Sequence, residues 1–199
     1  MSDLDDFSRY AKIIPEEHQP ALRKCLKKIP DFSWLLSEPH SDQDRLQGDL
    51  LREFPTVFLD DTATPRSARF TVMILNNTCD LPEGRLDFVT AAPVVDFQKY
   101  LEYEEPKRSP QSLQDYARSI RNNDKTELMY LPKITGFDHG ALVLLHLVCS
   151  VSAKVYHEAL RAGKRVASFS QVGFYFLLIK LTTHLARAES TDVSRSGNA

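Results

Sequence analysis

The chain has 199 residues and a formal net charge of -2, with 42% hydrophobic and 26% charged residues. This composition is typical of a globular domain, and a chain of this length usually buries roughly 70% of the surface that its unfolded form exposes. The seven glycines are never clustered, which excludes a phosphate-cradling loop. The near-neutral charge argues against general adhesion to nucleic acid. We therefore expect a single domain.

Targeting and redox signals are also absent from the sequence. The longest apolar stretches, 141–151 and 174–181, are shorter than the roughly 20 residues that cross a bilayer. The first ten residues have neither a basic flank nor an apolar core, as a secretory signal would. The three cysteines are widely spaced and odd in number, which fits neither a disulfide framework nor a metal knuckle. We expect a cytoplasmic protein with no membrane segment, metal or other cofactor.

Residues 1–45 are predicted to form a helical arm and a linker. Pro15 and the two glutamates after it are typical of a helix N-terminus. Leu22, Leu26 and Ile29 then recur at helical spacing, which predicts an amphipathic helix of roughly 13 residues. A short apolar cluster and a polar stretch follow. The arm either packs onto the main domain or docks a partner.

Residues 46–189 are predicted to form the main domain, built on antiparallel strands. The stretch from Arg69 to Leu75 is the strongest strand signal, because it is rich in β-branched and apolar residues. Periodicity leaves a strand or a buried helix open for 141–151, and we choose a strand because apolar and polar residues alternate there. Further strands are expected at residues 50–51, 56–59, 86–95 and 127–134.

Helices are predicted in two further places. In an insertion at 96–125, Asp96 would cap a short helix and Ser109 would precede a second one that begins with proline. Ser168 to Gln171 has the form of a capping box before a helix of roughly 18 residues. Residues 190–199 are expected to be a frayed tail. The fold class is α+β, with a bent antiparallel sheet or small, partly open β-barrel carrying an N-terminal arm, an inserted helix and a long C-terminal helix on the sheet.

Three segments resemble the MazF/PemK-like toxin superfamily. Gln47–Leu51 resembles the Gly-Asp opening of its first strand, and Arg66–Leu75 resembles its basic residue followed by a Val/Ile-rich strand. Ala92–Val95 resembles its later strand, which ends in a Pro-hydrophobic-Ser/Thr motif. The Asn-Thr-Cys-Asp-Leu string at 77–81 is similar to one in an uncharacterised prokaryotic branch. The resemblance spans 47–187 and implies a small, strongly bent antiparallel barrel.

The resemblance also implies which residues would act on RNA. Active members cleave single-stranded RNA without a metal, using an Arg at the head of the central strand and the Ser/Thr hydroxyl. On this sequence Arg66 or Arg69 matches the cation, whereas Val95 stands in the hydroxyl position and has no proton to share. The acid–base half would then be missing, or relocated to Thr78 or Asp80.

Two groups of residues are candidates for binding. Cys79 is either a nucleophile with a distant histidine or a small hydrophobe, and Asp80 either shapes its turn or contacts a ligand. The insertion mixes cations and tyrosines, which suits either stacking on single-stranded RNA or an ordinary exposed helix. The candidate binding residues are Asn77, Cys79, Asp80, Lys107, Arg108, Tyr116 and Arg121.

The favoured hypothesis is a catalytically degenerate MazF/PemK-like domain that binds a partner protein in a prokaryotic toxin–antitoxin-like, defence or regulatory system. The alternative is a metal-independent endoribonuclease toxin that cleaves single-stranded RNA. A third reading is a structural adaptor unrelated to this superfamily. A protein is the expected partner, single-stranded RNA and a second copy of the chain stay open, and neither DNA nor a membrane is expected.

Overall fold

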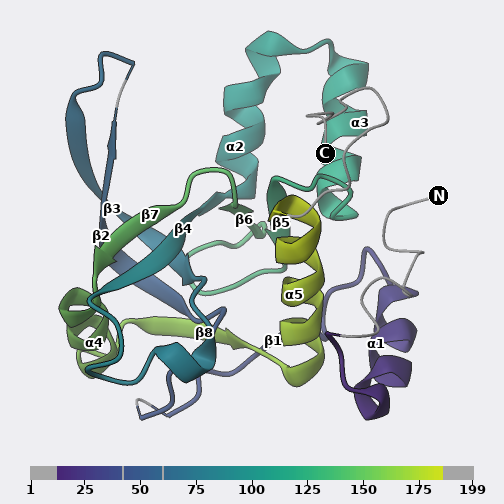
Figure 1. Ribbon diagram of the computed structural model, residues 1–199. Coiled ribbons are helices and arrows are strands. Elements are labelled where there is room, and N and C mark those ends of the chain that lie inside the picture. The colour runs from purple at the N-terminus through teal and green to yellow at the C-terminus, as the bar shows by residue number, and fades with distance from the viewer. Residues whose placement is uncertain (1–12, 42, 60, 186–199) are drawn as a thin grey trace, which may run out of the picture.

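The computed structural model describes residues 13–41, 43–59 and 61–185, which form a mixed α+β fold (Figure 1). Eight strands make one sheet in the order β1-β8-β2-β3-β4-β6-β5, with β7 also paired to β4. All the ladders between the described strands are antiparallel, and the sheet is not closed into a barrel. The predicted fold class is confirmed. The strands are β1 Leu36–Ser37, β2 Leu50–Leu59, β3 Pro65–Ile74, β4 Phe88–Asp96, β5 Leu128–Leu131, β6 Ala141–Leu144, β7 Cys149–Ser152 and β8 Arg165–Phe169.

Five α-helices and three short 3-10 helices lie in the described ranges. None of these helices is long and apolar enough to cross a membrane. The α-helices are α1 Gln19–Leu26, α2 Phe97–Glu104, α3 Pro110–Arg121, α4 Ala153–Arg161 and α5 Gln171–Leu185. The 3-10 helices are η2 Glu16–His18, η3 Thr78–Asp80 and η4 Glu105–Lys107.

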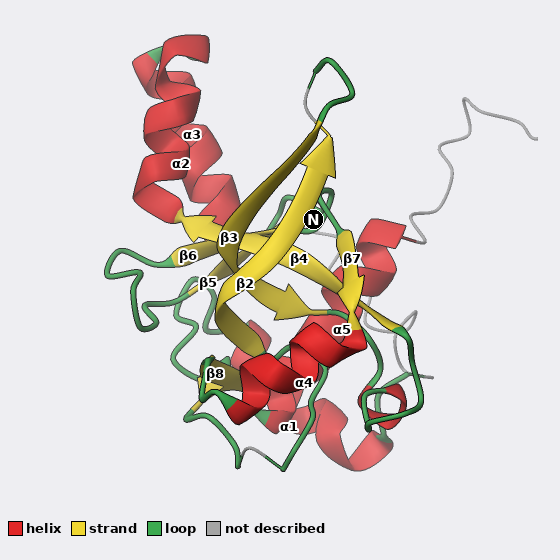
Figure 2. Ribbon diagram, turned by 90° about the vertical axis from the view of Figure 1, so that its left-hand side faces the viewer, coloured by secondary structure: helices red, strands yellow, loops and turns green. Residues whose placement is uncertain are grey.

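The two faces of the sheet are covered differently. Because side chains alternate along a strand, neighbours such as Leu50 and Leu51 enter different cores. One face packs against α5 and α1 in the largest core. The opposite face is covered at one end by α4 and at the other by α2 and α3. Figure 2 shows these two covers as separate bodies, with the β2–β3 hairpin projecting from the sheet.

A buried ion pair joins the start of β2 to β8. Asp49 Oδ2 lies 3.0 Å from Arg165 Nη2, and both side chains are buried. Ser168 Oγ donates to Asp49 Oδ1 at 2.7 Å, and the Leu46 amide donates to Asp49 Oδ2 at 3.1 Å. Burial raises the pKa of Asp49, although the Arg165 guanidinium acts in the opposite direction. Asp49 of the Gly-Asp sequence motif therefore has a structural role in the fold.

Arg165 also holds the segment that precedes β2. Its guanidinium donates to the carbonyls of His40 at 3.0 Å, Ser41 at 2.8 Å and Asp44. Gly48 lies in the same bend with a φ of 91°, and a Cβ there would meet the Phe169 ring at 2.6 Å. Only glycine fits this position without displacing the neighbouring ring.

Several predicted elements differ from the structure. The expected strand 141–151 is broken, because a turn in which the Leu147 amide donates to the Leu144 carbonyl separates β6 from β7. Ser168 does not cap the last helix, because it lies in β8 and bonds Asp49; Ser170 caps it instead by accepting from the Gly173 amide at 2.9 Å. The predicted N-terminal helix begins with the 3-10 helix η2, continues as α1 and ends at Leu26, earlier than expected.

The inserted helices agree with their predicted caps. Asp96 accepts from the Lys99 amide at 3.0 Å and starts α2, and Ser109 accepts from the Ser112 amide at 3.3 Å and starts α3. The predicted tail at 190–199 and the first 12 residues of the arm lie outside the described residues. The predicted domain boundaries stay predictions.

Lys180 is the other buried charge that ties distant segments together. It extends from α5, is 3% exposed, and donates to the carbonyls of Asn123 at 3.0 Å and Lys125. Asn123 in turn bonds both the amide and the carbonyl of Tyr130 in β5. Burial lowers the pKa of Lys180 to about 8. This cation therefore joins α5 to the α3–β5 connection.

Asp49→Asn should lower the free energy of unfolding by about 3–5 kcal/mol, because it leaves the buried Arg165 cation without its counter-charge. Urea denaturation of both forms measures the change. Asp115→Asn is the matched control: its ion pair with Arg118 is exposed on both sides, so the change should stay within about 0.5 kcal/mol. A loss below about 1 kcal/mol for Asp49→Asn would show that the pair is dispensable.

Lys180→Met should remove a pH dependence of stability. The folded pKa of about 8 lies below the ordinary 10.5, so the unfolded chain binds more protons between these values. Stability of the natural chain should therefore rise with pH in this window, by up to about 3 kcal/mol. Urea denaturation at pH 7.5 and pH 9.5 compares the two forms, which share the cysteines and tyrosines that also begin to titrate in this range. If the free energy of unfolding changed equally with pH in both forms, Lys180 would not be the source of the pH dependence.

Candidate functional site

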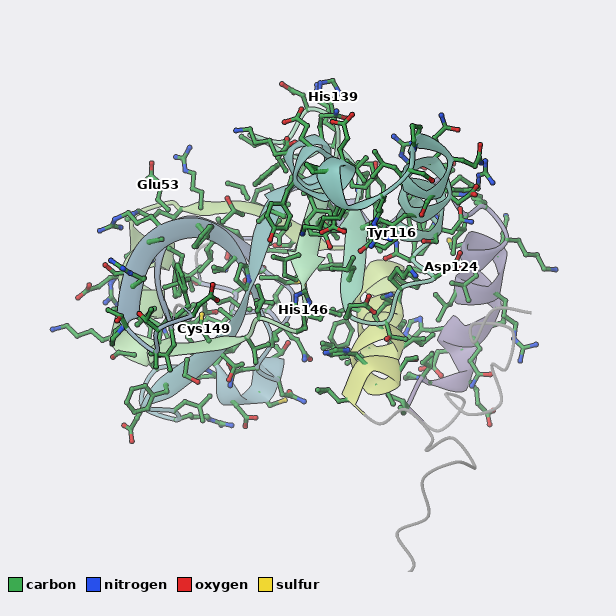
Figure 3. The ribbon with its side chains drawn as sticks, turned by 90° about the horizontal axis from the view of Figure 1, so that it is seen from above. Glu53, Tyr116, Asp124, His139, His146 and Cys149 are labelled. Atoms are coloured by element: carbon green, nitrogen blue, oxygen red, sulfur yellow. The ribbon has the colours of Figure 1, made fainter. Side chains whose placement is uncertain are left out.

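A groove runs along the part of the second sheet face that lies between its two helical covers. Its two overlapping cavities have volumes of about 540 and 770 Å³. We call the pair the central groove. Figure 3 shows His146 of its lining near the middle of the view, Cys149 among the strands on the left, and Tyr116 to the right. The residues that line both cavities are Phe70, Val95, Leu144, His146 and Leu147.

The groove is bordered by a two-stranded extension of the sheet, formed by residues 54–59 of β2 and 65–70 of β3. We call this extension the hairpin ribbon. β8 pairs with β2 only at Leu50 and Leu51, and β4 pairs with β3 only from Thr71 onward. Isolated two-stranded ribbons are marginally stable in water, so this one depends on what packs against it.

The rim of the smaller cavity is apolar and exposed. Val57, Phe58 and Leu59 lie on the ribbon, and Leu147 and Val148 lie in the β6–β7 turn. Their exposed fractions run from 48% to 66%, far more than core residues of these types show. A contiguous apolar rim around a cavity is typical of a surface that another molecule covers.

The larger cavity has charged walls. Arg69 donates from Nη1 to the Glu53 carbonyl at 3.0 Å. Glu104, which is buried, accepts from Lys107 at 2.8 Å and from Arg108 at 3.0 and 3.1 Å, and the Lys107 bond is the main reason why its pKa is lowered. Lys99 completes this wall from α2. The groove therefore joins an apolar half to a charged half, whose lining holds two cations, Arg69 and Lys99, and two carboxylates, Asp96 and Glu104.

Of the predicted catalytic residues, Arg69 shares the larger cavity with Val95. Arg66 lies further out on the ribbon, paired in register with Phe58. Thr78 and Asp80 are in η3, and neither belongs to the lining of the central groove. The structure therefore does not bring either of these relocated acid–base candidates into the cavity with Arg69, and their catalytic roles stay predictions.

The Asn77–Asp80 turn is organised by its own hydrogen bonds. Asn77 Oδ1 accepts from the Cys79 amide at 2.9 Å, and Thr78 Oγ1 accepts from the Gln47 amide at 3.1 Å. Arg85 donates to the Cys79 carbonyl at 2.7 Å. These contacts give the turn a structural role and fix it beside the segment that leads into β2.

The basic candidates of the insertion contact aromatic rings of the same insertion. Lys107 Nζ lies 3.4 Å from the centre of the Tyr103 ring, and the Arg108 guanidinium carbon lies 3.8 Å from that of Tyr116. Arg121 stands over Phe97 at 5.1 Å. The cations and rings thus satisfy one another within the α2–α3 pair. Binding of RNA here stays a prediction that these contacts do not favour.

His146, Phe70 and Leu147 are the groove residues that sequence reasoning missed. Two of them lie at the β6–β7 turn, which was hidden inside a predicted continuous strand. Cys149 lines the groove as well; it is half-buried, its thiol faces the Ala91 carbonyl at 3.6 Å, and burial raises its pKa. No cluster of His, Cys, Asp or Glu suited to a metal ion occurs in the described ranges.

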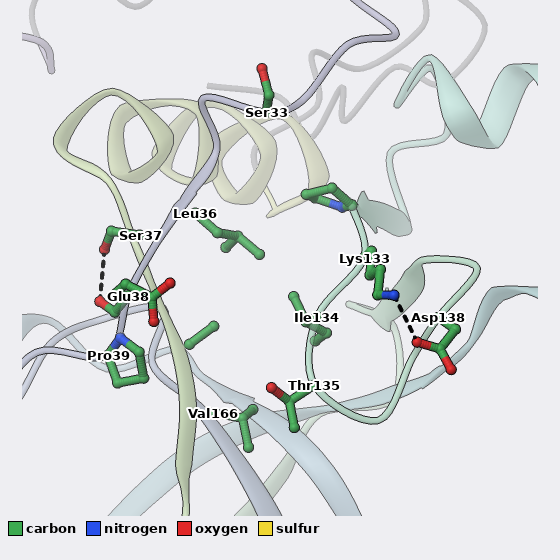
Figure 4. Close-up of a pocket in the computed structure, with 12 residues that line it drawn as sticks. Ser33, Leu36, Ser37, Glu38, Pro39, Lys133, Ile134, Thr135, Asp138 and Val166 are labelled. Atoms are coloured by element: carbon green, nitrogen blue, oxygen red, sulfur yellow. Dashed lines mark hydrogen bonds and ion pairs between the residues drawn. The ribbon is translucent and has the colours of Figure 1, made fainter.

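A separate cavity of about 570 Å³ lies between β1, β8 and the β5–β6 loop (Figure 4). Its exposed Lys133 and Asp138 pair at 3.1 Å, and Ser37 Oγ donates to the Glu38 carbonyl at 3.2 Å. Its polar groups pair locally, and none of the predicted site residues lines it. The central groove is therefore the stronger candidate.

Comparison with protein-family models and with curated proteins found no match to this chain. The function must be argued from the groove itself.

Cys149 should react slowly with iodoacetamide at pH 8, because burial limits both access to its thiol and formation of the thiolate. Cys79 is exposed and serves as the internal reference. Mass spectrometry of peptides from the labelled protein gives both rates, and we expect Cys79 to react at least tenfold faster. Faster labelling of Cys149 would reveal an activated thiol in the groove.

Proposed function

We propose that this chain is a binding domain of the MazF/PemK-like type, which holds a partner protein in the central groove and does not cleave RNA. The observation that carries the proposal is the groove itself. It has an exposed apolar rim, and Val95 lines it where the resemblance expects a hydroxyl. A surface of this kind binds by burying apolar area, whereas acid–base chemistry needs groups that hold and move protons.

The order of the strands supports the relationship. Gly48 and Asp49 directly precede β2, Arg66 and Arg69 lie in β3, and the Ala92–Val95 segment lies in β4. These strands are consecutive, adjacent and antiparallel. The resemblance implies these strands in this order within a small, strongly bent barrel, whereas the sheet here is not closed into a barrel. As in the sequence-based hypothesis, the domain would serve a prokaryotic toxin–antitoxin-like, defence or regulatory system.

One observation supports the alternative of an endoribonuclease. Arg69 and His146 line the same cavity, and a guanidinium with an imidazole can stabilise a phosphorane and transfer a proton. Against it, Arg69 already donates to the Glu53 carbonyl, and His146 Nδ1 lies 3.3 Å from the Glu127 carbonyl. The apolar rim of the adjoining smaller cavity also offers nothing to a phosphate backbone.

Leu147→Asp should abolish retention of the partner protein, because it places a charge on the apolar rim of the groove. The measurement is co-purification with the products of the neighbouring genes, co-expressed one at a time. Phe88→Asp is the matched control, since Phe88 is 64% exposed and lies outside the groove lining. We expect the control to retain the partner.

Incubation of the purified chain with single-stranded RNA tests the alternative directly. Cleavage by the natural chain that Arg69→Ala removes would overturn the proposal and favour the ribonuclease. Retention of the partner by Leu147→Asp, or equal loss in both Asp variants, would show that the groove does not hold it.

A further inference from the structure

The larger cavity lies in a fork between two strands of the sheet. β3 and β4 pair from Ile74 and Ala91 to Thr71 and Val94 and then separate. Beyond this point β3 continues with β2 as the hairpin ribbon, and β4 continues with β6. The cavity of about 770 Å³ is lined by residues of both diverging strands and by α2. Beyond Val94, β4 has only Val95 and Asp96 before α2 begins, so residues 65–70 of β3 extend past the end of β4.

The side of β3 that faces the fork carries an open backbone edge. Among the described strands, only β2 pairs with β3 between Pro65 and Phe70. In an antiparallel strand every second residue directs its N–H and C=O away from a given neighbour. Apart from Pro65, which has no N–H, the outer edge of this stretch therefore presents alternating donors and acceptors, which is the pattern that an added strand completes.

Side chains of different character leave the two faces of this part of β3. Phe70 and Arg69 are consecutive, so their side chains leave opposite faces of the strand, and both line the cavity. Phe70 shares the apolar lining with Val95 and Leu147. A strand laid beside β3 would place its own alternate residues next to these two different surroundings.

Charge around the fork favours an acidic occupant, although the whole chain carries a net charge of -2. Arg69 and Lys99 line the cavity, and Lys107 and Arg108 sit behind it on Glu104. Both carboxylates of the lining accept hydrogen bonds. Glu104 accepts from Lys107 and Arg108, and Asp96 accepts from the Lys99 amide in the first turn of α2. The lining is therefore balanced, and the local excess is positive when Lys107 and Arg108 are counted with it, as four cations against two carboxylates.

We propose that an extended partner segment, alternating apolar and acidic residues, adds as a strand to the β3 edge at residues 65–70. Its apolar side chains pack on Phe70 and Leu147, and its carboxylates face Arg69. This inference rests on the proposed function and names the partner's chemistry. A peptide fits better than RNA, because half of the groups on the backbone edge are carbonyl acceptors that would repel phosphate oxygens.

Fluorescence anisotropy with labelled synthetic hexapeptides tests the proposal on the full chain. A peptide of alternating Glu and Val should bind at least tenfold more tightly than one of alternating Lys and Val. N-methylation of alternate backbone amides on its strand-pairing edge should abolish binding, because it removes the donors that pair with β3. Hydrogen exchange should show added protection of amides within 65–70 when the acidic peptide binds.

Arg69→Glu should reverse the preference toward the Lys–Val peptide, whereas the matched control Arg118→Glu, on the exposed side of α3, should leave it unchanged. This reversal is a result that simple loss of structure cannot produce. Indifference to N-methylation, equal binding of both peptides, or binding of a labelled oligouridine instead of the acidic peptide would overturn strand addition. If strand addition fails but partner retention still depends on Leu147, the proposed function stands without it. If neither peptide binding nor partner retention depends on the groove, both the proposed function and strand addition are wrong.

Discussion

The buried pair of Asp49 and Arg165 fixes the position of the strands around β2. Its two charges lie far apart in the sequence, and removing either one would leave the other buried without its counter-charge. Arg165 donates through Nη1 and Nη2 to the carbonyls of the segment before β2, whereas its buried Nε has no hydrogen-bond partner among the described residues. The Ser168 hydroxyl donates to Asp49. β8, β2 and the preceding linker therefore form one unit. The rest of the sheet takes its register from β2.

The same arrangement determines where the sheet stays uncovered. With β8 paired to the first residues of β2, α4 packs over that end, and α2 and α3 follow β4 to the other end. Neither cover reaches the middle of this face, and the hairpin ribbon projects from the sheet there (Figure 2). The groove and the open strand fork are therefore consequences of how the strands pair, and no dedicated loop is needed to build them.

Sequence reasoning succeeded where the signal was local. Asp96 and Ser109 cap their helices as predicted, since an N-cap depends on amides two or three residues away. It failed where contacts between distant residues decide the local structure. Ser168 begins a capping-box sequence, yet its hydroxyl donates to Asp49. The helix at 153–161 was missed although Tyr156 and Leu160 have helical spacing, because the apolar stretch before it was assigned to one strand.

The site was predictable only in part for the same reason. The resemblance points to Arg69 and Val95, and both line the larger cavity. His146 and Leu147 could not be found in this way, because they enter the groove through a turn between two short strands. The absence of a hydroxyl at Val95 then has a physical meaning of its own. An apolar side chain at the floor of an open fork adds area that a bound segment can bury, and a hydroxyl there would lose its hydration when the segment binds.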